Sequence, residues 1–191
     1  MIKQFLSSAP FLFGIAVPIW VIIRIYVRRS RPVSWRREVW LAVFFTYMLM
    51  VAALTVMPER WATNREPALN LVPFASLREQ MTGTGSPEST MFFLQNLIGN
   101  LGLLLPLGVM LPALWERWRN FLDVVVIAAS VSVAIETIQF FLRYIGTYRM
   151  SDIDDVLLNT LGGAAGYFLF MAGKRFWSAS SGPKTAAISQ T

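Results

Sequence analysis

Five long apolar runs constrain this chain more than any other feature of its sequence. They cover residues 10–26, 39–57, 91–114, 121–142 and 156–173. A helix needs about 20 mostly apolar residues to cross the roughly 30 Å hydrocarbon core of a bilayer, and the runs approach or exceed that length. Only 15% of the residues are charged, whereas soluble domains are about 25% charged. The pattern predicts an all-α, multi-pass bundle of five transmembrane helices.

The runs follow one another closely enough to form a single domain, which we place at residues 1–177. The small, polar residues 178–191 predict a disordered tail. The first run resembles the apolar part of a signal peptide, but no small-residue cleavage site follows it. Six arginines follow instead, as in a stop-transfer segment, so we interpret the run as a permanent span: Arg24, Arg28, Arg29, Arg31, Arg36 and Arg37.

The distribution of basic residues predicts the orientation of these spans. Counted over alternate connections, eleven lysines and arginines lie on one side of the membrane and six on the other. Because lysine and arginine are enriched in cytoplasmic loops, the richer side is the cytoplasmic side. The N-terminus is therefore expected outside the cell and the C-terminus in the cytoplasm.

The composition also restricts the chemistry. The chain has no cysteine and no histidine, which excludes thiolate metal sites, disulfides and histidine-based catalytic triads. Carboxylates, amides, hydroxyls, tyrosine and arginine remain. The net charge of +6 comes mainly from residues that flank apolar runs. We therefore expect contacts with anionic membrane lipids and no binding of nucleic acid.

Three apolar runs carry polar side chains at spacings of three or four residues, which places each set on one helix face. Charged groups within a membrane segment are costly and are usually paired or functional. The three sets are Asn96 and Asn100; Glu136, Gln139 and Arg143; and Asp152, Asp155 and Asn159.

The predicted orientation brings these three sets to a similar depth in the outer half of the membrane. At 1.5 Å per residue, Glu136 lies roughly 9 Å and Asn100 roughly 13 Å from the outer end of its helix. Facing each other, the sets would form a polar pocket open to the outside. The structural alternative is that they only hold helices together, although polar pairs in membranes contribute only about 0.6 kcal/mol on average. Asp154 interrupts the stripe of the last run and is expected to face water.

The long connection at residues 58–90 contains the segment Asn70-Leu71-Val72-Pro73-Phe74. An apolar segment in a loop of this length has two interpretations. It seals the outer end of the bundle as a cap, or it lies in the membrane interface. Asn70 is in either case a candidate for contacting a ligand in the pocket.

These motifs together resemble the VanZ-like family of bacterial membrane proteins, named for a protein associated with resistance to the glycopeptide teicoplanin. The resemblance extends from the second apolar run to residue 173. It implies a protein of the bacterial plasma membrane and cell envelope. In this family an arginine precedes the aspartates, and both Arg143 and Arg149 fit that place. The motifs that carry the resemblance are Asn70-Leu71-Val72-Pro73-Phe74, Asn96-Leu97-Ile98-Gly99-Asn100, Glu136-Thr137-Ile138-Gln139, and Asp152-Ile153-Asp154-Asp155 continuing to Gly162-Gly163.

Three functions stay open from the sequence. The first is binding or modification of a lipid-linked or glycan envelope component, with a link to teicoplanin resistance. In an enzyme, the catalytic candidates would be Glu136, Asp155 and Asp152. An arginine, Arg143 or Arg149, would bind an anionic group. The amides would orient the substrate: Asn70, Asn96, Asn100, Gln139 and Asn159.

The other two functions are a non-enzymatic binding or assembly module, which could act as a homo-oligomer, and a small lipid transporter. A cluster of carboxylate and amide oxygens also suits Mg²⁺ or Ca²⁺, so a divalent cation is the cofactor that these side chains allow.

Overall fold

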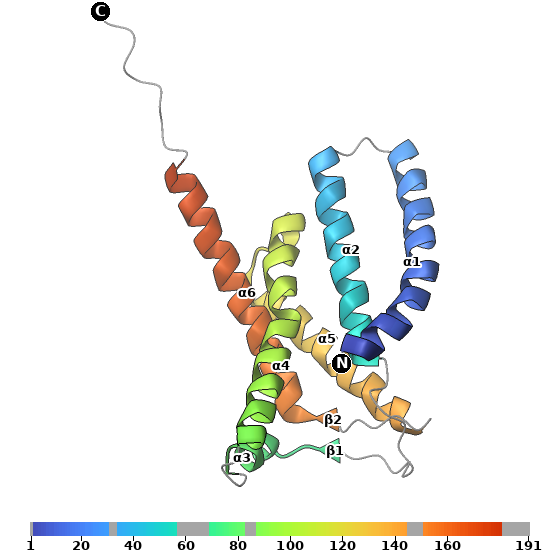
Figure 1. Ribbon diagram of the computed structural model, residues 1–191. Helices are drawn as coiled ribbons and strands as arrows, with labels where there is room; N and C mark the ends of the chain where they lie inside the picture. Colours follow the sequence, from blue (N-terminus) through green and yellow to red (C-terminus); the bar gives the residue numbers. More distant parts are fainter. Residues whose placement is uncertain (1, 31–33, 57–68, 83–86, 145–150, 181–191) are drawn as a thin grey trace, which may run out of the picture.

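The computed structural model describes residues 2–30, 34–56, 69–82, 87–144 and 151–180. Within these residues, six α-helices, one short 3-10 helix and two short strands follow one another along the chain (Figure 1). In order they are α1 (Ile2–Ser30), α2 (Trp35–Val56), β1 (Leu69–Asn70), α3 (Ala75–Thr82), α4 (Pro87–Leu114), η1 (Glu116–Trp118), α5 (Phe121–Tyr144), β2 (Ser151–Asp152) and α6 (Ile153–Ser180).

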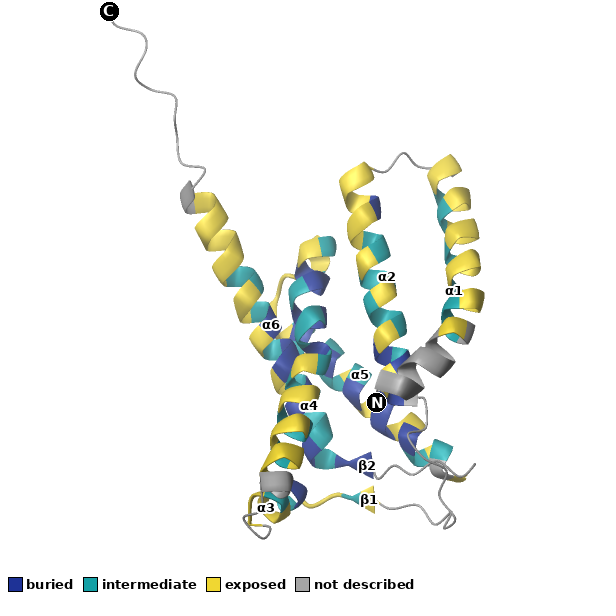
Figure 2. Cartoon of the chain, viewed as in Figure 1, coloured by how far each residue is buried: buried dark blue, intermediate teal, exposed yellow. Residues whose placement is uncertain are grey.

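Four of the helices are long and apolar enough to cross a membrane, judged over the described residues. The candidate spans are Trp35–Thr55, Thr90–Leu114, Phe121–Leu142 and Ile153–Ser178. Only 22% to 33% of the residues in the most apolar 18-residue window of each span are buried inside the protein, and the others are half-buried or exposed, as the colours of Figure 2 show. Such a surface is unfavourable in water and suits lipid. The predicted helical membrane bundle is confirmed, and α1 is not among these four spans.

The helices extend beyond the apolar runs at most ends. α6 begins at Ile153 and continues to Ser180. The first residues of the predicted tail, 178–180, belong to the last turn of α6. The rest of that tail lies outside the described residues.

The helices α4 and α6 cross at very short distance through glycines. A Cβ atom at Gly162 would lie 2.1 Å from the carbonyl oxygen of Leu101, and one at Gly108 would lie 1.9 Å from the carbonyl oxygen of Gly163. No side chain fits at either position. Small residues allow helix backbones to approach in this way, because association in lipid depends on packing rather than on exclusion of water.

The buried apolar core lies where α2, α4 and α5 meet α6. Leu104, Val124 and Ala128 are fully buried, and Val51 of α2 packs into the same cluster. The Tyr47 hydroxyl donates to the backbone oxygen of Leu103 at 2.8 Å, which links α2 to α4. The core fixes the crossing of the helices and thereby the positions of their ends.

The helix α1 packs along α2 at the edge of the bundle (Figure 2). The rings of Trp20 and Phe45 stack with centroids 5.1 Å apart. Arg24 forms a two-contact ion pair with Glu38, whose side chain is buried. Because both charges are neutralised within the α1–α2 pair, the ion pair tolerates apolar surroundings.

The two ends of the bundle differ in character. The start of α2 and the ends of α4 and α6 lie at one end, whereas α3, β1 and β2 lie at the other (Figure 1). The strands pair in parallel, Leu69 with Ser151 and Asn70 with Asp152. Neither strand is predicted by the apolar runs of the sequence. The pairing is only two residues long in each strand. It gives hydrogen-bond partners to backbone groups of the non-helical segments at the start of α6.

Candidate functional site

The strand pair places Asn70 beside the start of α6. The Asn70 amide nitrogen lies 3.2 Å from Asp152 Oδ1 and 2.8 Å from Ser76 Oγ, and donates to both. Asn70 Oδ1 accepts from the backbone N–H of Val72 at 3.1 Å. One side chain therefore connects β1 to the turn that precedes α3, to α3 itself and to β2.

Asp154 is buried, and the expectation that it faces water is wrong. Its side chain is 1% exposed. Its carboxylate accepts from the backbone N–H groups of Phe74 and Leu77, the second at 3.1 Å. Phe74 directly precedes α3 and Leu77 lies in its first turn, where backbone N–H groups have no partner within the helix. Asp154 thus caps α3 from a different helix, an interaction that the stripe pattern of α6 cannot reveal.

Glu136 joins the end of α5 to the same place. Its Oε2 atom accepts from the backbone N–H of Asp152 at 3.0 Å, and its backbone oxygen accepts from Ser151 Oγ at 2.8 Å. Asp152 Oδ1 also accepts from the backbone N–H of Asp154 at 2.9 Å. We call this set the buried cluster, because all its members are buried: Ser76, Glu136, Ser151, Asp152 and Asp154.

A second set of polar side chains lies between α3, α4 and α6. The Asn100 amide nitrogen donates to Asp155 Oδ1 and, at 3.1 Å, to Asn96 Oδ1. The Asn96 amide nitrogen lies 3.5 Å from Gln80 Oε1. All four side chains are partly exposed. We call Gln80, Asn96, Asn100 and Asp155 the amide row.

Gln139 and Asn159 belong to neither set. The Gln139 amide nitrogen donates to the backbone oxygen of Thr55 at 3.1 Å, which links α5 to α2. The Asn159 amide nitrogen donates to Ser132 Oγ at 3.0 Å, and its Oδ1 atom finds no donor among the described residues. Both side chains are buried and connect helices, as the structural alternative expects.

The two candidate arginines cannot be assigned to the site. Arg149 lies outside the described residues, and so does the side chain of Arg143. The groups that the structure does bring together are thus the carboxylates and amides of four helices and two strands.

Within the described part of the chain, no three acidic side chains converge on a point that could hold a metal ion. The reason is visible in the buried cluster. Asp152 and Asp154 direct oxygens at N–H donors, which occupy the positions that a cation would need. The cluster does not fit a divalent cation, and the amide row offers a single carboxylate, Asp155.

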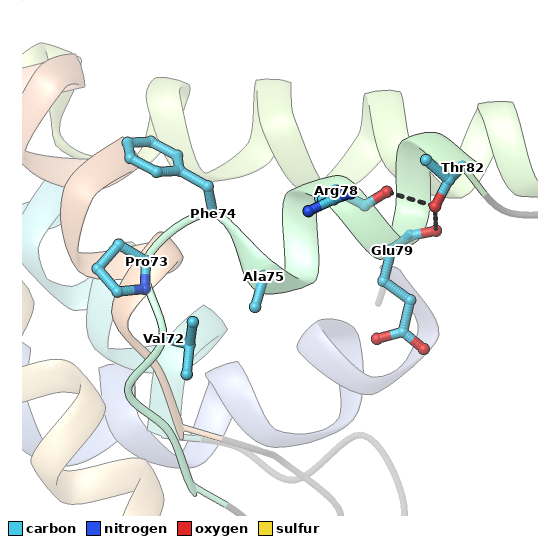
Figure 3. Close-up of a pocket in the computed structure, with 7 residues that line it drawn as sticks. All are labelled: Val72, Pro73, Phe74, Ala75, Arg78, Glu79 and Thr82. Carbon is cyan, nitrogen blue, oxygen red and sulfur yellow. Dashed lines mark hydrogen bonds between the residues drawn. The ribbon is translucent and has the colours of Figure 1, made fainter.

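A shallow groove of about 530 Å³ runs along α3. Figure 3 shows its lining, with the Phe74 ring and the Glu79 carboxylate on opposite sides of the helix. The groove combines apolar side chains with one cation and one anion, and its lining residues are Val72, Pro73, Phe74, Ala75, Arg78, Glu79 and Thr82. It lies on the segment that Asp154 and Asn70 hold in place.

Four polar residues of these contacts were not expected from the sequence, and one of them, Ser151, directly precedes Asp152. Ser132 lies four residues before Glu136 on the same face of α5, so extending the stripe would have found it. Gln80 and Ser76 lie in the long connection, and the sequence analysis predicted no helix there. Their place beside Asn96 and Asn70 depends on tertiary structure, and no spacing in the sequence signals it.

A scan of protein-family models matches the model for VanZ/LLP1 proteins over residues 39–176. The match covers most of the chain and includes both polar sets, whereas α1 lies before it. The chain therefore belongs to the VanZ/LLP1 family, as its motifs predict. Searches of curated proteins and of solved structures found no match.

Proposed function

We propose that this protein is a multi-pass protein of the bacterial plasma membrane that binds the polar part of a lipid-linked envelope component at the amide row. The observation that supports the proposal is the difference in exposure between the two polar sets. The carboxylates of the buried cluster already bind backbone N–H groups inside the protein. The amide row is partly exposed, so its side chains can exchange hydrogen bonds with a ligand.

The chemistry of the row favours a glycan or peptide group as the ligand. Three amides each present donors and acceptors, and Asp155 adds an acceptor. Hydroxyl and amide groups also donate and accept, so they match this set. A phosphate would require cations, which the described members of the row do not provide.

The position of the row favours a ligand that also has a lipid chain. Asn96 lies about one turn after Met91 and Phe92 in α4, and both of these apolar side chains are exposed. They belong to the candidate span Thr90–Leu114. A ligand whose polar part binds the row can therefore place an acyl or prenyl chain along α4 in the bilayer.

We further propose that α1 is a fifth span, with the N-terminus outside and the C-terminus in the cytoplasm. α1 is 29 residues long, and many of its large apolar side chains are exposed, including Ile19, Ile22 and Ile25. The excess of arginine at the end of the bundle away from α3 supports the same orientation. With this orientation, the amide row faces the cell envelope.

If the bound component is also modified, Asp155 is the general base that the geometry favours. A base must reach the proton that it removes. Asp155 is partly exposed, whereas Glu136 and Asp152 are buried. We assign those two to support of the site rather than to contact with substrate.

The test is native mass spectrometry of the protein in nanodiscs made from the membranes of the bacterium that expresses it. We expect the wild-type protein to retain an envelope lipid and Asp155→Asn to lose it. Asp123→Asn is the matched control, because Asp123 lies in the first turn of α5 at the other end of the bundle. Equal retention by all three proteins would contradict the proposal, and an unchanged mass of the retained lipid would favour binding over catalysis.

The link to resistance is tested separately. Expression of the wild-type protein in a sensitive strain should raise the lowest teicoplanin concentration that prevents growth, and Asp155→Asn should not. If both raise it equally, the amide row is not the basis of any resistance.

A further inference from the structure

The turn before α3 holds a phenylalanine in an unusual backbone conformation. The backbone N–H of Ala75 donates to the oxygen of Val72 at 3.2 Å, which closes a four-residue turn with Pro73 in its second position. Phe74, in the third position, has a φ angle of 64°. This turn type requires a positive φ there and normally has glycine or asparagine. A bulky side chain is unfavourable in that conformation, so its presence requires support from the surroundings.

The support comes from the buried cluster. Asp154 accepts a hydrogen bond from the backbone N–H of Phe74 itself and a second from Leu77. Because Asp154 belongs to α6, the turn is attached to the membrane-spanning bundle rather than held only by local contacts. The conformation directs the Phe74 ring away from α3 (Figure 3).

Large apolar side chains gather at this turn without protein cover. Leu71, Val72 and Phe74 are 65%, 64% and 63% exposed. Exposed apolar groups of this size beside one another are unusual on a surface that faces only water. Aromatic and aliphatic side chains at the end of a span are typical of the membrane interface.

The location of the turn identifies the bilayer as what covers it. α3 packs against α4 and contacts α6, and α4 enters its candidate span at Thr90. Met91 and Phe92 at the start of that span are also exposed. Arg78 lines the same groove as Phe74 and is exposed, as expected for a cation at the level of lipid phosphates.

We propose that Leu71, Val72 and Phe74 insert into the interfacial layer of the bilayer and anchor α3 there, with Arg78 at the phosphate level. The proposal concerns bulk lipid and does not depend on ligand binding at the amide row. It combines the two interpretations of this segment, because its backbone is held against the end of the bundle by Asp154 while its side chains enter the membrane.

The absence of cysteine from the chain allows a direct test by single-cysteine spin labelling in nanodiscs. Labels at Leu71→Cys and Phe74→Cys should collide several-fold more often with oxygen, relative to a water-soluble nickel complex, than a label at Glu79→Cys. Glu79 is the control because it is an exposed, charged residue of the same groove whose carboxylate points away from the Phe74 ring (Figure 3). Equal accessibility of the three labels to the nickel complex would overturn the proposal. So would spin–spin broadening at Phe74, which would show that a second copy covers the turn.

A second variant separates anchoring from folding. Phe74→Gly keeps the backbone conformation, which glycine adopts without strain, and removes the ring. We expect thermal stability in detergent to be kept or raised, while a label at Leu71 becomes several-fold more accessible to the nickel complex. An unchanged accessibility at Leu71 would show that Phe74 does not anchor the turn.

Discussion

The buried cluster and the amide row lie at the same end of the bundle and both contain carboxylates, yet they differ in exposure. Asp154 and Asp155 are neighbours in the sequence and illustrate the difference. Asp154 is enclosed and accepts from two backbone N–H groups at the start of α3, those of Phe74 and Leu77. Asp155 is partly exposed and accepts from the side chain of Asn100.

The difference shows that two carboxylates of one sequence motif can have different roles, even when both lie near the membrane surface. A buried carboxylate must be satisfied within the protein, and backbone N–H groups of α3 and β2 satisfy the buried cluster. A half-exposed carboxylate can change partners without a large penalty. We therefore assign support of the loop to the first set and ligand contact to the second.

The largest effect is expected from separating α4 and α6. The Cβ of Gly162→Val would clash with the backbone oxygen of Leu101, 2.1 Å away, so the helices must move apart. Leu101 follows Asn100, and we expect the Asn100–Asp155 contact to break. Native mass spectrometry should show loss of the envelope lipid, and the melting temperature in detergent should fall sharply.

The control for this variant is Gly102→Ala, because a Cβ at Gly102 meets no atom within 4 Å. It should leave melting and lipid retention unchanged. If Gly162→Val retained the lipid at the wild-type level, the amide row would not depend on the crossing of α4 and α6, and its assignment as the binding site would fail.

A smaller but still large effect is expected at the buried cluster. Asp154→Ala leaves two N–H groups at the start of α3 without their acceptor, and each such group costs roughly 1–3 kcal/mol. We expect the free energy of unfolding to fall by about 3 kcal/mol, measured by titration with denaturing detergent. Glu79→Ala on exposed α3 surface should change it little. A fall equally small for Asp154→Ala would show that Asp154 does not hold α3.

The smallest effect is expected at the pair of Asn159 and Ser132. Polar pairs between membrane helices contribute about 0.6 kcal/mol on average, so the coupling free energy of Asn159→Leu and Ser132→Ala should be near that value. A double-mutant cycle of the same unfolding titration measures it. Lipid retention should survive both changes, whereas its loss in Asn159→Leu alone would return Asn159 to the binding site.

The sequence predicted the helical membrane bundle well because apolar length is a local property. The runs at 121–142 and 91–114 end within a few residues of α5 and α4. The stripes also placed Asn100 and Asp155 on helix faces of similar depth, and in the structure these two side chains are hydrogen-bonded. Periodicity identifies a face, and the core determines which face points inward.

The sequence could not predict contacts made by segments without periodicity. The position of Asp154 depends on the start of α3, which lies in a long connection and is brought to α6 by the pairing of β1 with β2. Gln139 has the spacing of a pocket residue, but α2 passes close to it and offers the backbone oxygen of Thr55. The number of spans also differs between the two: the sequence predicts five, whereas the four candidate spans of the structure do not include α1, which packs at the edge of the bundle.

The comparison between the two neighbouring aspartates is tested most directly by measuring unfolding and lipid retention for Asp154→Asn and Asp155→Asn side by side. The first change replaces one acceptor oxygen by a donor that faces a backbone N–H, and the second keeps an oxygen for Asn100. We expect Asp154→Asn to lower the free energy of unfolding clearly, and Asp155→Asn to abolish lipid retention with stability near that of the wild type. The opposite pattern, or two variants that lose both properties equally, would contradict the division of the site into a supporting cluster and a binding row.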